Sequence, residues 1–310
     1  MPTAFISHPD CLLHDAGSYH PECPARLQAI EDELANRGVM DKLQPYLAPQ
    51  ATYEQLKRIH TPDYIASLEA MVSRAEAVGM VYLDPDTGMN RHSLKAAYRA
   101  AGAVILATDL VTAGTVDNAF CSVRPPGHHA EQDRGMGFCL FNNVAAGVAY
   151  AIAAYALERI AVVDFDVHHG NGTENIFAND PRVMMVSIFQ HPFYPYSGIG
   201  GRSDRMINIP LAADSDGEIF RTAGSEFWLP ALDRFKPQML FISAGFDAHR
   251  DDTLGSLNLV EDDYAWVTGR IREVAGEHAG NRIVSVLEGG YDLYALGRSV
   301  AAHVEVLAGP

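Results

Sequence analysis

Residues 159–174 read RIAVVDFDVHHGNGTE, and this stretch decides the fold. It opens with the apolar, β-branched run 160–163, which predicts a buried strand. Ionisable side chains then crowd together, namely Asp164, Asp166, His168 and His169. Side chains two residues apart on a strand point the same way, so the first three share one face if the extended backbone persists to His168. The GNGTE that follows ends the strand and predicts the start of a helix.

Four ionisable groups directly behind a buried strand require neutralisation. A single polar residue in such a place is most often a surface group. Burying four of them without partners would cost several kcal/mol each. Carboxylate oxygens and imidazole nitrogens are ligands of Zn²⁺. The stretch therefore predicts a metal site at the end of this strand.

Strands alternate with helices from about residue 93 onward. We expect strands at 4–6, 118–123, 160–163, 182–189, 239–244 and 283–287, and helices at 25–37, 63–77, 93–113, 142–156, 214–232, 261–275 and 296–307. This alternation predicts an α/β fold, with a parallel sheet covered by helices on both faces. Because no Gly-, Ser- or Pro-rich linker interrupts the pattern, residues 1–310 are expected to form one domain.

The composition narrows the possible partners. The chain has 310 residues, and 23 Lys and Arg against 39 Asp and Glu give a net charge of −16. Such a charge argues against binding to nucleic acids and anionic membranes. The sequence shows no secretory signal and no apolar run long enough to span a bilayer. Its four cysteines have no CxxC spacing, so we expect a reduced, cytoplasmic protein.

Each candidate chemical group follows a predicted strand. These groups are His128 and His129, the cluster at 164–169, Asp247 and Tyr291. Open parallel sheets bind their ligands at the carboxyl ends of the strands. Segments that are far apart in the sequence are thus expected to meet in one crevice.

Several sequence blocks resemble a known family. They are HPECPAR (20–26), RPPGHHAEQDRGMGFCLFNN (124–143), VVDFDVHHGNGTE (162–174), SAGFDA (243–248) and LEGGYDL (287–293). In this order they closely resemble the histone deacetylase superfamily, in its class II-like bacterial branch. The resemblance implies an arginase–deacetylase fold with a predominantly parallel sheet of eight strands, and a zinc-dependent deacetylase activity.

The resemblance also implies the positions of the metal ions. Three side chains are similar to the ligands of a catalytic Zn²⁺, namely Asp166, His168 and Asp247. Three protein ligands leave a coordination position open for water and the substrate carbonyl. The family also binds K⁺ near the zinc, and the inner potassium site would use Asp164, Asp166, His168, Ser187 and Ile188.

The catalytic roles follow from the same resemblance. Asp164 would pair with His128, whereas His129 would be the general base and later the acid that protonates the leaving amine. Asn171 stands where class I enzymes carry a second Asp. Asn171 should therefore raise the pKa of His129 less than a carboxylate at this position would. Tyr291 would donate its hydroxyl to the oxyanion.

The implied acyl-lysine tunnel indicates the substrate class. Its residues would be Gly137, Phe138, Tyr194 and Leu254, with Tyr194 at a position where Phe is common. Acetylpolyamine-preferring relatives carry an acidic gatekeeper where this chain has Leu254, which favours acetylated lysine. The acidic rim residues Asp84 and Asp86 would attract any cationic substrate. An acetylpolyamine or another small amide therefore remains an alternative substrate. Asp251 and Asp252, close to Leu254 in sequence, are expected to face solvent.

Two other functions on this fold are disfavoured. A binuclear manganese ureohydrolase needs a DxHxD motif and a second carboxylate pair, but His168 is followed by His169-Gly170, and GFDAH offers only Asp247. A catalytically inactive binding module would be expected to lack Tyr291 or one of the paired histidines, and all three are present.

Overall fold

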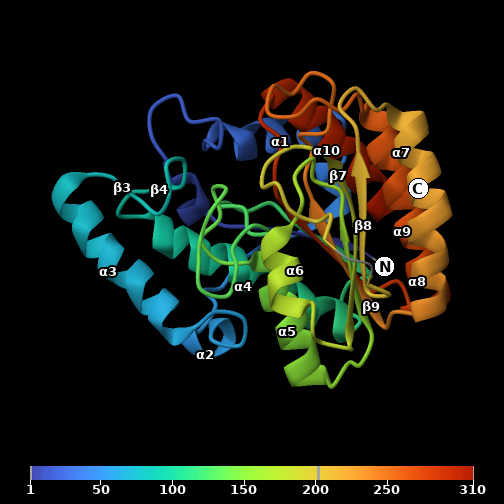
Figure 1. Cartoon of the computed structure of the whole chain (residues 1–310), viewed down its shortest axis with the longest axis horizontal. Coiled ribbons are helices and arrows are strands. Elements are labelled where there is room, and N and C mark those ends of the chain that lie inside the picture. The colour runs from blue at the N-terminus through green and yellow to red at the C-terminus, as the bar shows by residue number, and fades with distance from the viewer. Residues whose placement is uncertain (1, 201–202, 310) are drawn as a thin grey trace.

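The centre of the computed structural model is one large sheet, and the structure describes residues 2–200 and 203–309 (Figure 1). All strand pairs in this sheet are parallel, and the strand order is β2-β1-β5-β10-β9-β6-β7-β8. Its strands are β1 (Thr3–Ser7), β2 (Leu43–Leu47), β5 (Asn118–Cys121), β6 (Ile160–Asp164), β7 (Val183–Gln190), β8 (Met206–Leu211), β9 (Met239–Ala244) and β10 (Ile283–Leu287). A separate antiparallel pair joins β3 (Val81–Tyr82) to β4 (Gly88–Met89). The predicted parallel α/β sheet is thereby confirmed.

Helices surround the sheet. They are α1 (Ala25–Asn36), α2 (Tyr53–Leu56), α3 (Pro62–Val78), α4 (Ser93–Thr112), α5 (Asn143–Tyr155), α6 (Asn171–Phe177), α7 (Gly217–Ala223), α8 (Leu229–Phe235), α9 (Glu261–His278) and α10 (Leu293–Ala308). A π-helical segment, Gly224–Trp228, joins α7 to α8, so the helix expected at 214–232 is interrupted. Short 3₁₀ turns occupy Pro9–Leu12 and Met40–Lys42.

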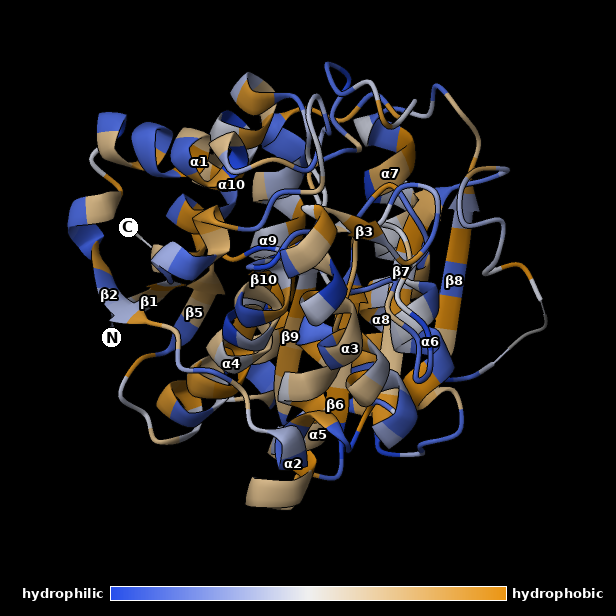
Figure 2. Ribbon diagram, turned by 90° about the vertical axis from the view of Figure 1, so that its left-hand side faces the viewer, coloured by the Kyte–Doolittle hydropathy of each residue, from blue (hydrophilic) through white to orange (hydrophobic). Residues whose placement is uncertain are grey.

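Both faces of the sheet are buried under helices. Phe241 of β9 contacts α5 at Gly147, where an added Cβ would lie 2.7 Å from the Phe241 ring. On the opposite face, Ser285 of β10 lies 2.8 Å from His303 of α10. Figure 2 shows hydrophobic residues concentrated in β6 and β9. Strands buried on both faces read as continuous apolar runs, which is why the central strands were predictable.

His303 contributes a pH-dependent term to the stability of this core. Burial lowers the pKa of His303 to about 3, and its ring nitrogens lie beside the hydroxyls of Thr268 and Ser285. Below pH ~6.5 the unfolded chain binds a proton that the folded chain excludes, so stability falls by about 1.4 kcal/mol per pH unit as pH decreases. When the pH is lowered from 7 to 5, the free energy of unfolding measured with urea should therefore decrease by about 2 kcal/mol more in the wild type than in His303→Leu. Equal losses in the two proteins would contradict this assignment.

The two strands at the sheet edges, β2 and β8, were not predicted. Their sequences are LQPYL and MINIPL, and much of each strand is exposed or half-buried. Pro45 and Pro210 read as strand breakers, because proline lacks the N–H that a central strand needs. An edge strand tolerates this loss, so the sequence signal for a strand was weak at both positions.

The stretch at 159–174 differs from the simplest expectation in one respect. β6 ends at Asp164, so the extended backbone does not continue to His168. The first three ionisable groups are consequently not arranged as one row on a strand. The next helix, α6, begins at Asn171, immediately behind the metal-ligand candidates.

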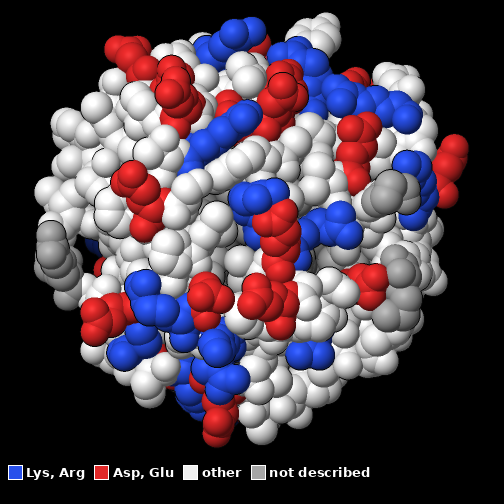
Figure 3. Space-filling view, turned by 90° about the vertical axis from the view of Figure 1, so that its right-hand side faces the viewer, with Lys and Arg blue, Asp and Glu red and all other residues white. Residues whose placement is uncertain are grey.

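The charged surface is mixed in sign where it can be seen over α7, α8 and α9. Figure 3 shows acidic and basic side chains interspersed on this face. Within residues 2–200 and 203–309, no helix has the length and apolar character needed to cross a membrane.

Candidate active site

The predicted chemical groups lie beyond the carboxyl ends of neighbouring strands. β6 lies between β7 and β9, and β10 lies between β9 and β5. The loops that follow β5, β6, β9 and β10 therefore emerge at one edge of the sheet. These loops carry the histidine pair, the cluster after Asp164, Asp247 and Tyr291.

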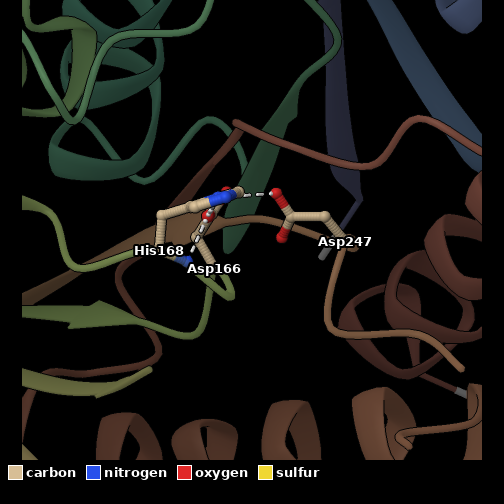
Figure 4. Close-up of side chains that lie close together, drawn as sticks. All are labelled: Asp166, His168 and Asp247. Atoms are coloured by element: carbon tan, nitrogen blue, oxygen red, sulfur yellow. Dashed lines mark hydrogen bonds and ion pairs between the residues drawn. The ribbon is translucent and has the colours of Figure 1, made fainter. Parts of the chain in front are cut away.

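Three of these groups form a compact ligand set. Asp166, His168 and Asp247 each offer a ligand atom within 4.8 Å of the others (Figure 4). His168 Nδ1 lies 3.0 Å from an oxygen of Asp166 and 3.2 Å from Asp247 Oδ2. Burial works to lower the pKa of His168, but the two carboxylates outweigh it and raise the pKa to about 10. Two buried carboxylates facing one imidazole nitrogen suit a divalent cation, whose binding would displace the imidazole proton.

The backbone holds both carboxylates in place. Asp166 Oδ2 accepts the N–H of Gly289 at 2.9 Å, and Asp247 Oδ1 accepts the N–H of Val167 at 2.9 Å. Gly289 approaches so closely that an added Cβ would lie 2.0 Å from Asp247 Oδ2. Only glycine fits there, which explains the first glycine of the LEGGY block in physical terms.

The pKa values of the paired histidines are shifted in opposite directions. Burial works to lower the pKa of His128, but the carboxylates of Asp166 and Asp164 outweigh it and raise the pKa to about 10. Its Nδ1 lies 3.0 Å from Asp164 Oδ2. Burial, followed by the positive charge of His128, holds the pKa of His129 well below its usual range. A cationic His128 thus lies beside a neutral His129, with ring centroids 4.0 Å apart.

Asn171 fixes the tautomer of His129. Asn171 Oδ1 lies 2.8 Å from His129 Nδ1, and Asn171 Nδ2 donates to Glu131 Oε1 at 2.6 Å. Because the amide nitrogen is bound to a carboxylate, its oxygen faces the imidazole, and Nδ1 must carry the proton. The lone pair of His129 is therefore on Nε2.

The ring of Tyr291 contacts an arginine and a phenylalanine. The Arg26 guanidinium lies over the ring, 4.9 Å from its centroid, and Phe138 meets it edge-on at 5.7 Å. Arg26 Nε also donates to the carbonyl of Gly290 at 2.6 Å. Burial raises the pKa of Tyr291 well above its usual value, so its hydroxyl remains a donor.

Two buried ionisable residues near the site were not singled out from the sequence. Arg26 closes the HPECPAR block, and Glu288 is the acid of LEGGY. Glu288 Oε2 accepts the N–H groups of Gly127 at 2.6 Å and of His128 at 3.1 Å. Burial raises the pKa of Glu288 to about 7. Both residues are ionisable and lie within sequence motifs, and this was the signal by which they could have been predicted.

The aromatic residues around the ligand set include one that was not predicted. The ring of Phe193 stacks on His168, with centroids 5.3 Å apart and planes 17° apart. Tyr194 instead meets His129 edge-on at 5.3 Å, and its hydroxyl lies 3.0 Å from where a Cβ on Gly137 would stand. Phe193 and Tyr194 are adjacent in the sequence, and the backbone conformation at this point determines which of the two rings stacks on His168.

The residues of the implied inner potassium site include an unsatisfied donor. Ser187 of β7 lies in register with Asp164 of β6. Its hydroxyl is buried and has no hydrogen-bond partner within the described residues. A buried hydroxyl without a partner calls for a ligand that the protein itself does not supply. Ile188 follows it in the buried core.

Comparisons with known proteins agree with this arrangement. The family model described as "Histone deacetylase domain" matches residues 20–307. A "Histone deacetylase-like amidohydrolase" from Pseudomonas aeruginosa is 36% identical, over 93% of this chain and 81% of its own length. A "Probable deacetylase" from Archaeoglobus fulgidus is also 36% identical, over 94% of this chain and 82% of its own.

A solved structure shows the same fold. The "Crystal Structure of HDA15 HD domain" matches with a TM-score of 0.90 and 33% sequence identity, over 99% of this chain and 88% of that one. The family model, the two relatives and this structure carry the same assignment, so the arginase–deacetylase fold implied by the sequence motifs is confirmed. The chain belongs to the histone deacetylase family.

Proposed function

We propose that the protein is a zinc-dependent deacetylase that hydrolyses the N-acetyl amide of lysine side chains in proteins or peptides. The observation that carries the proposal is the buried His129 next to the three candidate metal ligands, with its ring centroid 5.9 Å from that of His168. A base and a Lewis-acid site at this spacing suit the attack of water on an amide. Assaying the purified protein with acetyl-lysine peptides tests it.

The residues of the chain divide the chemistry among them. Bound to Asp166, His168 and Asp247, Zn²⁺ would polarise the amide carbonyl and acidify water. His129 Nε2 accepts the proton of the attacking water and returns it to the leaving amine, while Asn171 keeps Nδ1 protonated. His128 remains cationic and favours the negative charge that develops in the transition state.

Tyr291 is proposed as the donor to the developing oxyanion. Tyr291→Phe keeps the ring under the Arg26 guanidinium and removes only the hydroxyl. The turnover number should then fall by about 10²–10³-fold with little change in substrate affinity. Steady-state kinetics with a saturating acetyl-lysine peptide measure this, and an unchanged kcat would remove the hydroxyl from the transition state. A loss of affinity alone would favour a binding module instead.

The proposed tunnel adds to this site. Phe138 and Phe193 would form its walls, since Phe138 borders Tyr291 and Phe193 stacks on His168. The motifs also assign Gly137, Tyr194 and Leu254 to the tunnel. Gly137 lies between the base and Tyr194, since an added Cβ would stand 2.5 Å from His129 Cδ2 and 3.0 Å from the Tyr194 hydroxyl. We also propose a K⁺ ion at the group formed by Asp164, Asp166, His168, Ser187 and Ile188, on the evidence of the unpaired Ser187 hydroxyl.

We further propose that residues 1–310 form a single domain and that the protein is located in the cytoplasm.

An acetylpolyamine is the second candidate substrate. The acidic rim loop lies close to the site, because Thr87 Oγ1 accepts the N–H of Phe138 at 3.1 Å. His20 Nε2 also lies 3.0 Å from the carbonyl oxygen of Asp86, and the His20 ring meets Phe138 at 4.6 Å. Burial, together with Asp84, raises the pKa of Asp86 to about 6. The carboxylates of this loop favour a substrate with an additional positive charge. Comparing kcat/KM for acetyl-lysine peptides and N-acetylpolyamines decides between the two.

A binuclear ureohydrolase finds no support at the residue after His168. His169 Nδ1 lies 2.8 Å from the Ser197 hydroxyl, and its Nε2 lies 2.6 Å from Glu174 Oε2. Both ring nitrogens face protein partners, so His169 is not free to bind a second metal ion. The proposal therefore stays with one catalytic metal.

A further inference from the structure

Asp252 is buried, contrary to the expectation that it faces solvent. Only 5% of its surface is exposed, whereas the side chain of the adjacent Asp251 is 50% exposed and pairs with Arg298 at 3.2 Å. A carboxylate is rarely buried unless hydrogen bonds satisfy it. The sequence RDDT made the two aspartates look alike, and the fold separates them.

The two oxygens of Asp252 bind different loops. Oδ2 accepts the N–H of Tyr291 at 2.5 Å and the N–H of Asp292 at 3.1 Å. Oδ1 accepts the N–H of Leu254 at 2.9 Å. Hydrogen bonds from backbone amides to an ionised carboxylate are among the stronger ones in proteins. One buried side chain thus connects the segment that carries Tyr291 to the segment that carries Leu254.

The segment with Tyr291 needs such an anchor. It follows Gly289 and Gly290, and Gly290 has a φ of +118°, a conformation that other residues rarely adopt. Two glycines leave the backbone before Tyr291 with little intrinsic rigidity. Directly after it, Asp292 caps α10 by accepting the N–H of Ala295 at 2.8 Å. The Asp252 carboxylate therefore holds the chain at the point where the glycine turn meets the helix.

We propose that Asp252 is a positioning residue that fixes the backbone of Tyr291, and with it the tyrosine hydroxyl, relative to the metal ligands. The inference rests on the proposed deacetylase function. Arg26 and Phe138 contact the ring of Tyr291, whereas Asp252 binds its backbone, so the two sets of contacts are complementary. Within residues 2–200 and 203–309, no hydrogen bond or ion pair joins Asp252 to Asp166, His168 or Asp247. Its direct contacts instead run to the backbone of Leu254, Tyr291 and Asp292.

Kinetics of matched variants test the proposal. Asp252→Ala should lower kcat by about 10²-fold, the effect of a misplacement of order 1 Å, with a smaller change in KM. Asp252→Asn should lose about tenfold, because its one amide oxygen cannot serve both loops. Asp251→Ala is the control at the neighbouring position and should retain wild-type kcat. In a protein that already carries Tyr291→Phe, adding Asp252→Ala should lower kcat by less than about threefold. The hydroxyl that Asp252 positions is already absent from that protein.

Two further measurements separate this role from general damage. Bound zinc per protein should be the same in Asp252→Ala as in the wild type. Hydrogen exchange of the peptide that contains Tyr291 and Asp292 should be faster in both Asp252 variants and unchanged in Asp251→Ala. If the wild type hydrolyses no acyl amide, the proposed function fails, yet the exchange result still decides whether Asp252 anchors this segment.

Several outcomes would overturn the inference. One is a wild-type kcat in both Asp252 variants. Another is that Asp252→Ala lowers kcat by the same factor in the wild-type protein and in Tyr291→Phe. Loss of zinc would assign Asp252 to the metal site instead. If Asp252→Ala does not fold, Asp252→Asn decides by the same kinetic and exchange measurements.

Discussion

Replacing His129 by alanine should lower kcat/KM by about 10²–10⁴-fold, the usual cost of removing a general base. The reason is the state of its imidazole. Burial and the neighbouring cationic His128 keep the pKa of His129 low, and the Asn171 carbonyl holds the proton on Nδ1. A free lone pair on Nε2 results. Among the ring contacts of His168 in the described part of the chain, His129 is the only imidazole.

His128→Ala provides the comparison for this prediction. It removes a positive charge that Asp164 and Asp166 stabilise, so it should retain more activity than His129→Ala. Initial rates with an acetyl-lysine peptide, measured across a range of pH, report both effects. A His129 variant that kept the wild-type kcat/KM and pH profile would show that the roles assigned to the two histidines are wrong.

Replacing Asp247 by alanine should remove both metal and activity. The change leaves two protein ligands, and catalytic zinc sites are built from three. It also removes the carboxylate that orders the Val167 N–H at the start of the ligand loop. Metal analysis of the purified variant should therefore find much less zinc than in the wild type, with a parallel loss of hydrolysis.

Chelation of the wild-type protein tests the same claim without a mutation. Activity should disappear with the metal and return on addition of Zn²⁺ or Co²⁺, which share a preference for this set of oxygen and nitrogen ligands. Circular dichroism before and after chelation controls for unfolding. Hydrolysis of an acetyl amide by protein that contains no divalent metal would contradict the proposal.

The central part of the fold was predictable because its residues obey local rules. The strands expected at 239–244 and 283–287 agree with the observed β9 and β10, since short apolar runs followed by glycine, at Gly245 and Gly289, leave few alternatives. The convergence of Asp166, His168 and Asp247 followed from parallel topology and the sequence motifs. Such features depend on neighbours in sequence or on the order of strands.

Other features depend on contacts that only the folded chain creates. RDDT gives no sign that Asp252 is buried and Asp251 exposed, because the difference arises from the amides of Tyr291 and Asp292. Likewise, Phe193 and Tyr194 are both aromatic, and the turn between them decides which ring stacks on His168. Propensity and periodicity contain neither kind of information.

The prolines in β2 and β8 have a consequence for the behaviour of the protein in concentrated solution. An open sheet offers unpaired backbone groups at both ends, and a strand from a second molecule can add to them and start aggregation. Pro45 and Pro210 each remove an N–H from these outermost strands. The residues that concealed the strands in the sequence thus make both ends of the sheet poor templates for further growth.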